Sequence, residues 1–252
     1  MQNLDIRLEY SPGDYLFAVT AFYKEVSEPI EQVSLAPPGD VGASTLTTYI
    51  NNENDATIEG FELEAQTSLA FILMRDDGSW LENIGLGANY TIIDAKVERT
   101  TLEKKLATQG GDAAVVAAFN SLGDERNLFD QPERLANAFV SLNVPEWGSR
   151  FTVSGTLTGR QLQVVGSVGS HPDLYLEETI GVNFVWEQEL TDHISLKFSA
   201  KNINSPELKL VRDEDFVSAL RADGGNVSNQ LGGFRSSYET EPTYSISVSG
   251  KF

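Results

Sequence analysis

The sequence contains no cysteine and no long apolar run. Without cysteine the chain forms no disulfide, no thiolate zinc site and no thiol nucleophile. Its apolar runs, such as Leu69–Met74, are far shorter than the roughly 20 residues of a membrane-spanning helix, so no such helix is predicted. Basic residues are also scarce: 18 Lys and Arg stand against 37 Asp and Glu, and the resulting net charge of −19 repels nucleic acid.

Sequence signatures of catalysis are missing as well. The chain has no nucleophile elbow, no phosphate-binding glycine loop and no histidine pair spaced for a metal. Asp213, Glu214 and Asp215 lack the spaced oxygen ligands of a calcium loop, and their position favours the start of a short helix. We therefore expect no enzyme, no cofactor and no metal site.

The dominant pattern that is present has a period of two residues, which is the side-chain repeat of a β-strand. It is clearest at the end of the chain, where an apolar face alternates with a face of Thr, Ser and Lys. The residues of the apolar face are Tyr244, Ile246, Val248, Gly250 and Phe252.

The same alternation predicts nine strands in all, with short and long connections in turn. The strands run over roughly 3–11, 15–33, 46–70, 83–98, 134–145, 149–165, 174–190, 194–204 and 242–252. The short connections are Ser11–Asp14, Arg75–Leu81, Pro145–Gly148 and Thr191–His193. The long ones are Ala36–Ser44, Arg99–Glu133, Gly166–Pro172 and Ser205–Glu241, and two short helices are expected in them, at Ala113–Phe119 and after Asp213.

Strands with one polar and one apolar face occur in soluble β-sandwiches and in membrane barrels. Most of these strands reach the roughly 9–11 residues that cross a bilayer at a tilt, and aromatic residues lie near their ends, at Tyr15, Trp147, Trp186 and Phe252. Short turns at one end and long loops at the other are also typical of outer-membrane proteins. The predicted fold class is therefore all-β, an antiparallel transmembrane β-barrel.

Three segments resemble TonB-dependent outer-membrane receptors. Asn54–Ala65 is similar to a strand of that family with the pattern Asn-x-Ala-x-x-x-Gly-x-Glu-Leu-Glu, and Ser199–Asn204 resembles its Asn-Leu-x-Asn motif, shortened by one residue. The terminal strand, with Tyr244, Ile246, Val248 and Phe252, resembles the signal that the barrel-assembly machinery recognises.

The resemblance implies the architecture and the partners of the whole protein. Family barrels have 22 strands around an N-terminal plug, so residues 1–252 would be their last nine strands, with the plug and the first strands absent from this sequence. The sequence opens with an alternating strand rather than an export signal, and we expect the natural start to lie upstream of Met1. The implied partners are outer-membrane lipid, the missing strands and plug, and TonB through that plug, in a Gram-negative outer membrane.

The implied function is the energised uptake of a scarce nutrient such as a siderophore, cobalamin or a glycan. A passive porin-like barrel and a soluble secreted β-sandwich remain as alternatives. Glu62, Glu64 and Gln66 are expected to face the lumen, as plug or substrate contacts or as ordinary lumen polarity. Arg160, near the outer rim, can hold an anionic ligand or pair with lumen acids, and His171 can touch a metal chelate or stay solvated.

Overall fold

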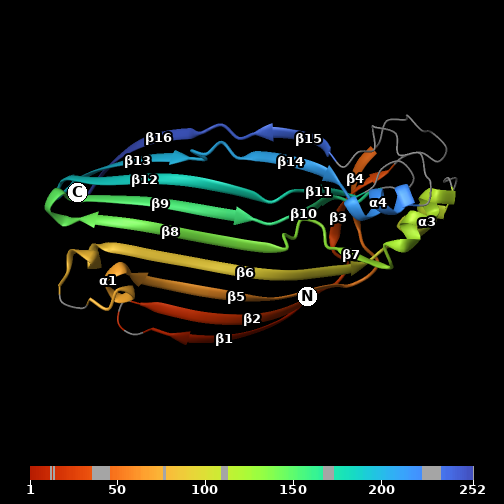
Figure 1. Cartoon of the computed structure of the whole chain (residues 1–252), viewed down its shortest axis with the longest axis horizontal. Helices are drawn as coiled ribbons and strands as arrows, with labels where there is room; N and C mark the ends of the chain where they lie inside the picture. The colour runs from red at the N-terminus through yellow and green to blue at the C-terminus, as the bar shows by residue number, and fades with distance from the viewer. Residues whose placement is uncertain are drawn as a thin grey trace.

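A computed structural model describes residues 1–11, 13, 15–35, 46–75, 78–108, 113–166, 173–222 and 234–251. Its largest sheet has ten strands among these residues, and nine of them follow one antiparallel path (Figure 1). In path order they are β1 (Gln2–Tyr10), β2 (Leu16–Val26), β5 (Ala56–Ser68), β6 (Ile84–Glu98), β8 (Arg134–Val144), β9 (Ser149–Thr158), β12 (Thr179–Thr191), β13 (Ile194–Lys201) and β16 (Thr243–Gly250). These nine strands confirm the predicted set.

Two smaller sheets and several short helices occupy the connections. The tenth strand of the main sheet, β7 (Glu125–Asn127), pairs with β6. One small sheet consists of β10 (Gln161–Val164), β11 (Leu174–Leu176), β14 (Glu207–Arg212) and β15 (Phe234–Glu239), and the other of β3 (Ile30–Leu35) and β4 (Leu46–Asn51). The helices are α1 (Leu69–Ile72), α2 (Thr101–Thr108), α3 (Ala113–Ser121) and α4 (Glu214–Ala222), with 3-10 turns η1 (Trp80–Asn83) and η2 (Pro145–Trp147). None of the helices in the described residues is long and apolar enough to cross a membrane.

The connections segregate to the two ends of the main sheet. The short ones, including α1, η1 and η2, lie at the end that is on the left in Figure 1, which we call the turn end. The long ones lie at the opposite end, the loop end, together with both small sheets and helices α2, α3 and α4 (Figure 1). The alternation of short and long connections is therefore confirmed.

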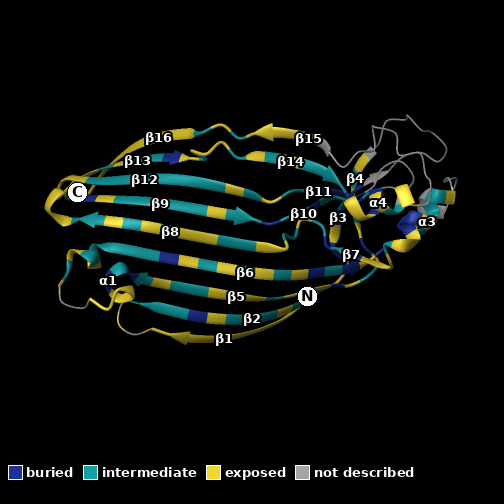
Figure 2. Cartoon of the chain, in the orientation of Figure 1, coloured by how far each residue is buried: buried dark blue, intermediate teal, exposed yellow. Residues whose placement is uncertain are grey.

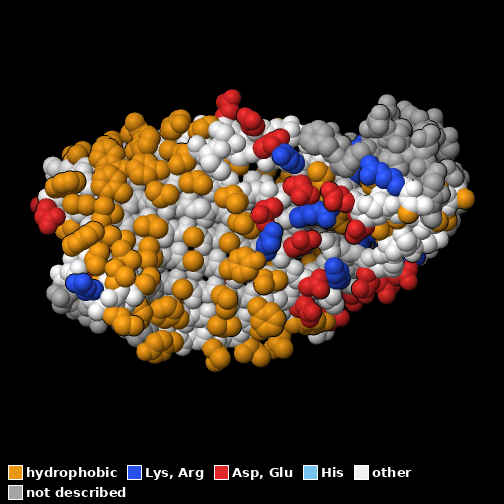
Figure 3. All heavy atoms as spheres, in the orientation of Figure 1, with side chains coloured by type: hydrophobic (Ala, Val, Ile, Leu, Met, Phe, Trp, Pro, Cys, Tyr) orange, Lys and Arg blue, Asp and Glu red, His pale blue; other side chains and the backbone are white. Residues whose placement is uncertain are grey.

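One face of the main sheet is apolar over all nine strands, and its residues pair with each other across the strands. Leu8 faces Val19, Val19 faces Leu63, and Leu63 faces Tyr90. Large apolar side chains on this face are exposed to solvent. Ile246, on the edge strand β16, has an exposed fraction of 72%. Figure 3 shows them as a continuous field over the turn-end half of the molecule. A soluble sandwich covers such a face with a second sheet, and the described residues provide none.

The opposite face is polar at the same level, with pairs such as Glu64 with Asn89 and Asn137 with Thr156. Towards the loop end the two faces exchange character. On the formerly polar face, Ala95 and Val97 are 7% and 2% exposed and pack with Ala56 under Leu128. On the formerly apolar face, Asp94 and other charged residues come to the surface (Figure 3).

The two outermost strands of the path are open edges. β1 pairs with β2 and β16 pairs with β13, and no pairing joins β1 to β16 among the described residues. Every residue of both strands is exposed (Figure 2). The described part of the chain is thus an open arc of sheet whose outer backbone groups lack strand partners.

Several sequence predictions need correction at the loop end. The strands expected at 15–33, 46–70, 149–165 and 174–190 are each divided. The first two break because the chain turns at Glu28, with a positive φ of 50°, and again between β4 and β5. The other two divide into β9 and β10 and into β11 and β12, and β10 and β11 belong to the small sheet. The strand expected at 46–70 also ends early, at Ser68, whose hydroxyl accepts from the Phe71 N–H and starts α1. The expected loop 99–133 contains α2 and β7 in addition to the predicted helix, which is confirmed as α3. The expected loop 205–241 contains β14 and β15 in addition to the predicted helix, which is confirmed as α4.

Two glycines on the polar face lie under phenylalanine rings of the neighbouring strand. A Cβ added to Gly60 would lie 2.5 Å from the Phe22 ring and 2.1 Å from the Ile92 backbone oxygen. A Cβ on Gly87 would lie 2.1 Å from the Phe139 ring. Each ring therefore covers the backbone of a residue that has no side chain of its own, and no larger residue fits beneath it.

This close approach predicts that Gly60→Ala destabilises the sheet. We expect a loss of about 1–3 kcal/mol in the free energy of unfolding, because the added methyl group would force the Phe22 ring and the Ile92 carbonyl to move. Gly155→Ala is the matched control, since its nearest neighbour to an added Cβ, the Gly181 oxygen, is 4.0 Å away. Denaturant titration in detergent, followed by tryptophan fluorescence, measures both; equal losses would contradict the proposed contact.

Candidate functional site

The polar face carries a charged cluster around Arg7 on the edge strand β1. The Arg7 guanidinium donates to Glu64 at 2.9 Å and to Glu9 at 3.1 Å. Glu62 and Gln66 lie on the same face as Glu64, two residues to either side along β5. The structure thus places the three predicted lumen residues together, and one of them already has a cationic partner.

The segment Asn54–Ala65 has a structural reason at several of its positions. The Asn54 side chain donates to the Glu98 backbone oxygen at 3.3 Å, at the point where β6 ends. Ala56 has no exposed surface, Gly60 admits the Phe22 ring, and the residues after it alternate between the two faces. The pattern that resembles the receptor family is therefore a set of packing and pairing requirements of this strand.

The asparagines of Ser199–Asn204 continue the hydrogen bonding of β13 after its regular pairing ends. Asn202 has a positive φ of 55°, which turns the chain away from β12. The Asn204 side chain then accepts from the Val182 N–H at 2.9 Å and donates to the Ile180 oxygen at 2.7 Å. One amide side chain thereby replaces a backbone partner for both groups.

Arg160 lies between β9 and β10, at the junction of the main sheet with the small sheet. Its guanidinium stacks over the Tyr175 ring at 4.0 Å and approaches the Glu177 carboxylate at 3.3 Å. Burial and the nearby carboxylates of Asp173 and Asp213 raise the pKa of Tyr175. The residue lies at the loop end, and its charge interacts with an acid and an aromatic ring.

A buried ionic network at the loop end was not predicted from the sequence. Arg126 of β7 pairs with Glu31 of β3 through both terminal nitrogens, each at 2.7 Å, and its Nε donates to Glu103 of α2 at 2.8 Å. The three side chains are 1%, 0% and 7% exposed. Arg99 extends the network, lying 3.6 Å from Glu103 and 3.4 Å from Asp173.

The network joins three of the four long connections. Glu31 belongs to the connection between β2 and β5, Arg99, Glu103 and Arg126 to that between β6 and β8, and Asp173 to that between β9 and β12. The fourth connection joins by apolar contact, since Phe216 of α4 packs with residues of α3. We call this packed group of connections the cap.

Burial and ion pairing within the cap shift the pKa values of three of its residues, Glu103, Arg126 and Asp213. Burial opposes ionisation of Glu103, but hydrogen bonding and charge from Arg126 outweigh it and lower the pKa of Glu103 below its ordinary value. Burial also opposes the charge on Arg126, yet Glu31 and Glu103 raise the pKa of that guanidinium. Burial and the neighbouring Asp173 raise the pKa of Asp213, which accepts from the Asp215 N–H at the start of α4.

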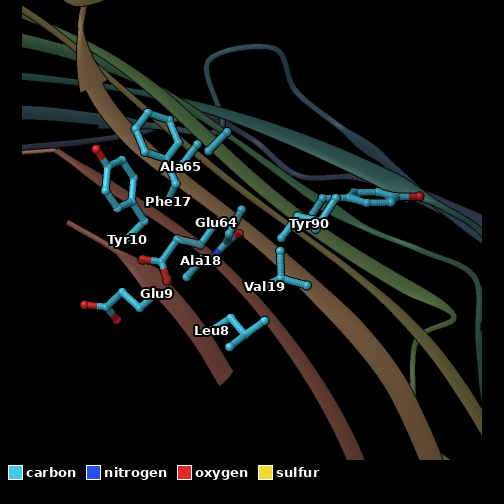
Figure 4. Close-up of a pocket in the computed structure, with 12 residues that line it drawn as sticks. Leu8, Glu9, Tyr10, Phe17, Ala18, Val19, Glu64, Ala65 and Tyr90 are labelled. Carbon is cyan, nitrogen blue, oxygen red and sulfur yellow. The ribbon is translucent and has the colours of Figure 1, made fainter. Parts of the chain in front are cut away.

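A shallow hollow lies on the apolar face. It has a volume of about 440 Å³ and lies between β1, β2, β5 and β6 (Figure 4). Apolar residues such as Leu8, Val19 and Tyr90 make up most of its lining (Figure 4). Such a hollow suits a hydrocarbon chain rather than a polar nutrient.

Some predicted residues lie outside the described part of the chain, namely His171 and Phe252. Tyr244, Ile246 and Val248 are on the apolar face of β16, each more than 60% exposed. Within the described ranges there is no group of three or more His, Asp or Glu side chains able to hold a metal ion.

The family described as "TonB dependent receptor-like, beta-barrel" matches residues 1–203. The chain belongs to this family. Among solved structures, the copper transporter OprC superposes with a TM-score of 0.58 at 15% sequence identity, over 99% of this chain and 31% of the transporter. The chain therefore spans about a third of that neighbour, and the likeness shows a common fold. None of the curated proteins matches the sequence.

Members of the TonB-dependent receptor family are outer-membrane proteins. In barrels of such proteins an apolar face lies against lipid and a polar face lines the interior, and the two faces of this arc have that character. The cap packs on the polar-face side of the sheet at the loop end, where Leu128 contacts Ala95 and Val97.

The network predicts that Glu31→Gln loosens the cap of the receptor. Loss of this carboxylate leaves the buried Arg126 charge with one acidic partner fewer, which costs about 3–5 kcal/mol. Glu207→Gln is the control, because the Lys209–Glu207 pair is about half exposed and solvent screens it, so its loss changes stability little. Hydrogen exchange of β3 and β7 should accelerate in the first variant alone; unchanged exchange in both would refute the stabilising role.

The lowered pKa of Glu103 predicts a cap that weakens in acid. A carboxylate whose folded pKa is depressed contributes stability that is fully present above its ordinary value of 4.5 and is lost as the pH falls through the lowered value. Exchange in α2 should therefore rise on acidification, relative to exchange in β9. Glu103→Gln should flatten this dependence, and an identical pH profile in that variant would show that another group controls it.

Proposed function

We propose that the chain forms part of the wall of a TonB-dependent receptor that imports a scarce nutrient across the outer membrane. The observation that carries the proposal is the sheet itself, with one apolar face, one polar face and a cap of long loops at one end. Membership of the family supports it. The long-loop end would face the exterior, where nutrient is captured, and the turn end the periplasm.

The open edges support completion of the barrel by further strands. Eight antiparallel pairings separate β1 from β16, so these two edge strands run in the same direction. An antiparallel barrel then closes only with an odd number of additional strands between them. The thirteen that a 22-stranded family barrel would add satisfy this condition, and a plug filling the interior would carry the contact with TonB.

The common direction of β1 and β16 also disfavours closure by a second copy of the chain. Two copies related by rotation about the membrane normal would place β1 beside a β16 that runs in the same direction, which gives a parallel junction. Strands in outer-membrane barrels are antiparallel. The last strand, with Tyr244, Ile246, Val248 and Phe252, would instead be the segment presented to the assembly machinery.

The cargo is proposed only as a class, a scarce nutrient such as a siderophore, cobalamin or a glycan. Arg160, Glu62, Glu64 and Gln66 are the proposed contacts with cargo or plug. Copper is the cargo named for the structural neighbour, but an identity of 15% is a likeness of fold and does not transfer it.

Growth of the host on limiting nutrients tests the proposal. A strain lacking the gene should lose uptake of one iron chelate, cobalamin or glycan, and a strain lacking TonB should show the same loss. Purified protein in liposomes should not permit solute diffusion once its plug is present. Uptake that persists without TonB, together with free diffusion in liposomes, would identify a passive pore and contradict the proposal.

A further inference from the structure

Two adjoining hollows lie where the apolar face gives way to charge. The apolar one has a volume of about 400 Å³, and its lining includes Leu4, Ile6, Ala21, Tyr23, Phe61 and Ile92. The polar one has a volume of about 430 Å³, and its lining includes Asp94, Lys96, Asn127, Gln131, Glu133 and Arg134. Ile92 and Asp94 line both, so the two hollows adjoin along these residues.

The polar hollow exists because β6 changes partner at this point. β8 pairs with β6 as far as Ile92, and β7 begins to pair with it at Lys96. Between these positions the connecting residues leave the sheet, held by the Ile93 N–H on the Glu133 oxygen at 2.9 Å. A gap in strand pairing therefore opens at the surface, next to exposed charges (Figure 3).

The charges in the polar hollow are already balanced. Lys96 donates to Asn127 at 2.9 Å and lies 3.4 Å from Asp94. Arg134 pairs with Glu178 at 2.6 Å. A bare phosphate would have to displace these carboxylates, whereas a hydroxyl group can donate to a carboxylate and accept from a cation at once.

We propose that the two hollows bind a glycolipid of the outer leaflet, with its sugar headgroup in the polar hollow and an acyl chain in the apolar one. The level of the site fits this occupant, since the apolar field that lies in hydrocarbon ends at Phe61 and Ile92 and charged side chains begin at Asp94. The proposal depends on the position of the barrel in the membrane and not on the transport of any cargo.

Native mass spectrometry of the protein from outer membranes, stripped of lipid in mild detergent, tests the site. The probe is an acylated glucosamine disaccharide without phosphates, and phosphatidylglycerol with acyl chains of equal length is the comparison. The parent protein should bind the disaccharide lipid at least tenfold more tightly than phosphatidylglycerol. Equal binding of the two lipids would overturn the assignment of a sugar headgroup.

Paired variants localise the binding. Lys96→Ala with Arg134→Ala should weaken binding of the disaccharide lipid at least tenfold, and Ala21→Phe, which fills the apolar hollow, should weaken it as well. Lys197→Ala with Lys209→Ala is the control, since it removes two comparably exposed, ion-paired lysines outside the hollows. Heat-dependent electrophoretic mobility reports folding of each variant. Folded variants that all bind equally would place the lipid elsewhere and overturn the proposal.

Discussion

Backbone hydrogen bonding in a medium without water is the constraint on which the rest of the structure depends. At the level of the hydrocarbon each N–H and C=O must find a partner inside the protein, and a closed antiparallel barrel meets that demand. The strands from β2 to β13 meet it by pairing with a neighbour on both sides, and Asn204 meets it with a side chain where β13 turns away. β1 and β16 each have one unmet edge, which is why the proposed function includes further strands.

The exchange of character between the two faces follows from a change of solvent along the same strands. In the proposed receptor wall, the outward face near the turn end meets lipid and the inward face meets water, so Ile92 and Thr91 point to opposite surroundings. Beyond Ile92 the outward face meets water and the inward face meets the cap, so Asp94 is 61% exposed in its side chain whereas Ala95 is 7% exposed. The buried Arg126 network lies in this second region. Carboxylates of the connections, and not water, pair there with the buried guanidinium.

The period-two pattern predicted the nine strands because each has one apolar face and one polar face. It could not predict the loop end. There the apolar and polar faces change places, so alternation no longer separates strands of the main sheet from strands of the cap. The break at Glu28 depends on a positive φ in an ordinary residue, and the short strands β7, β11 and β14 depend on partners distant in sequence. Glu62, Glu64 and Gln66 were placed correctly on the polar face by parity alone, whereas the meeting of Glu31 with Arg126, 95 residues apart, has no local signal.

Spin labels along β6 test the central claim most directly, because the chain has no native cysteine to interfere. Single cysteines at Tyr90, Thr91, Ile92, Asp94 and Ala95 would carry the label in the protein reconstituted in lipid. A membrane barrel predicts collisions with lipid-soluble oxygen at Tyr90 and Ile92, with a water-soluble nickel chelate at Asp94, and with neither at Ala95. Nickel collisions at Tyr90 and Ile92 would place the apolar face in water and contradict the membrane barrel.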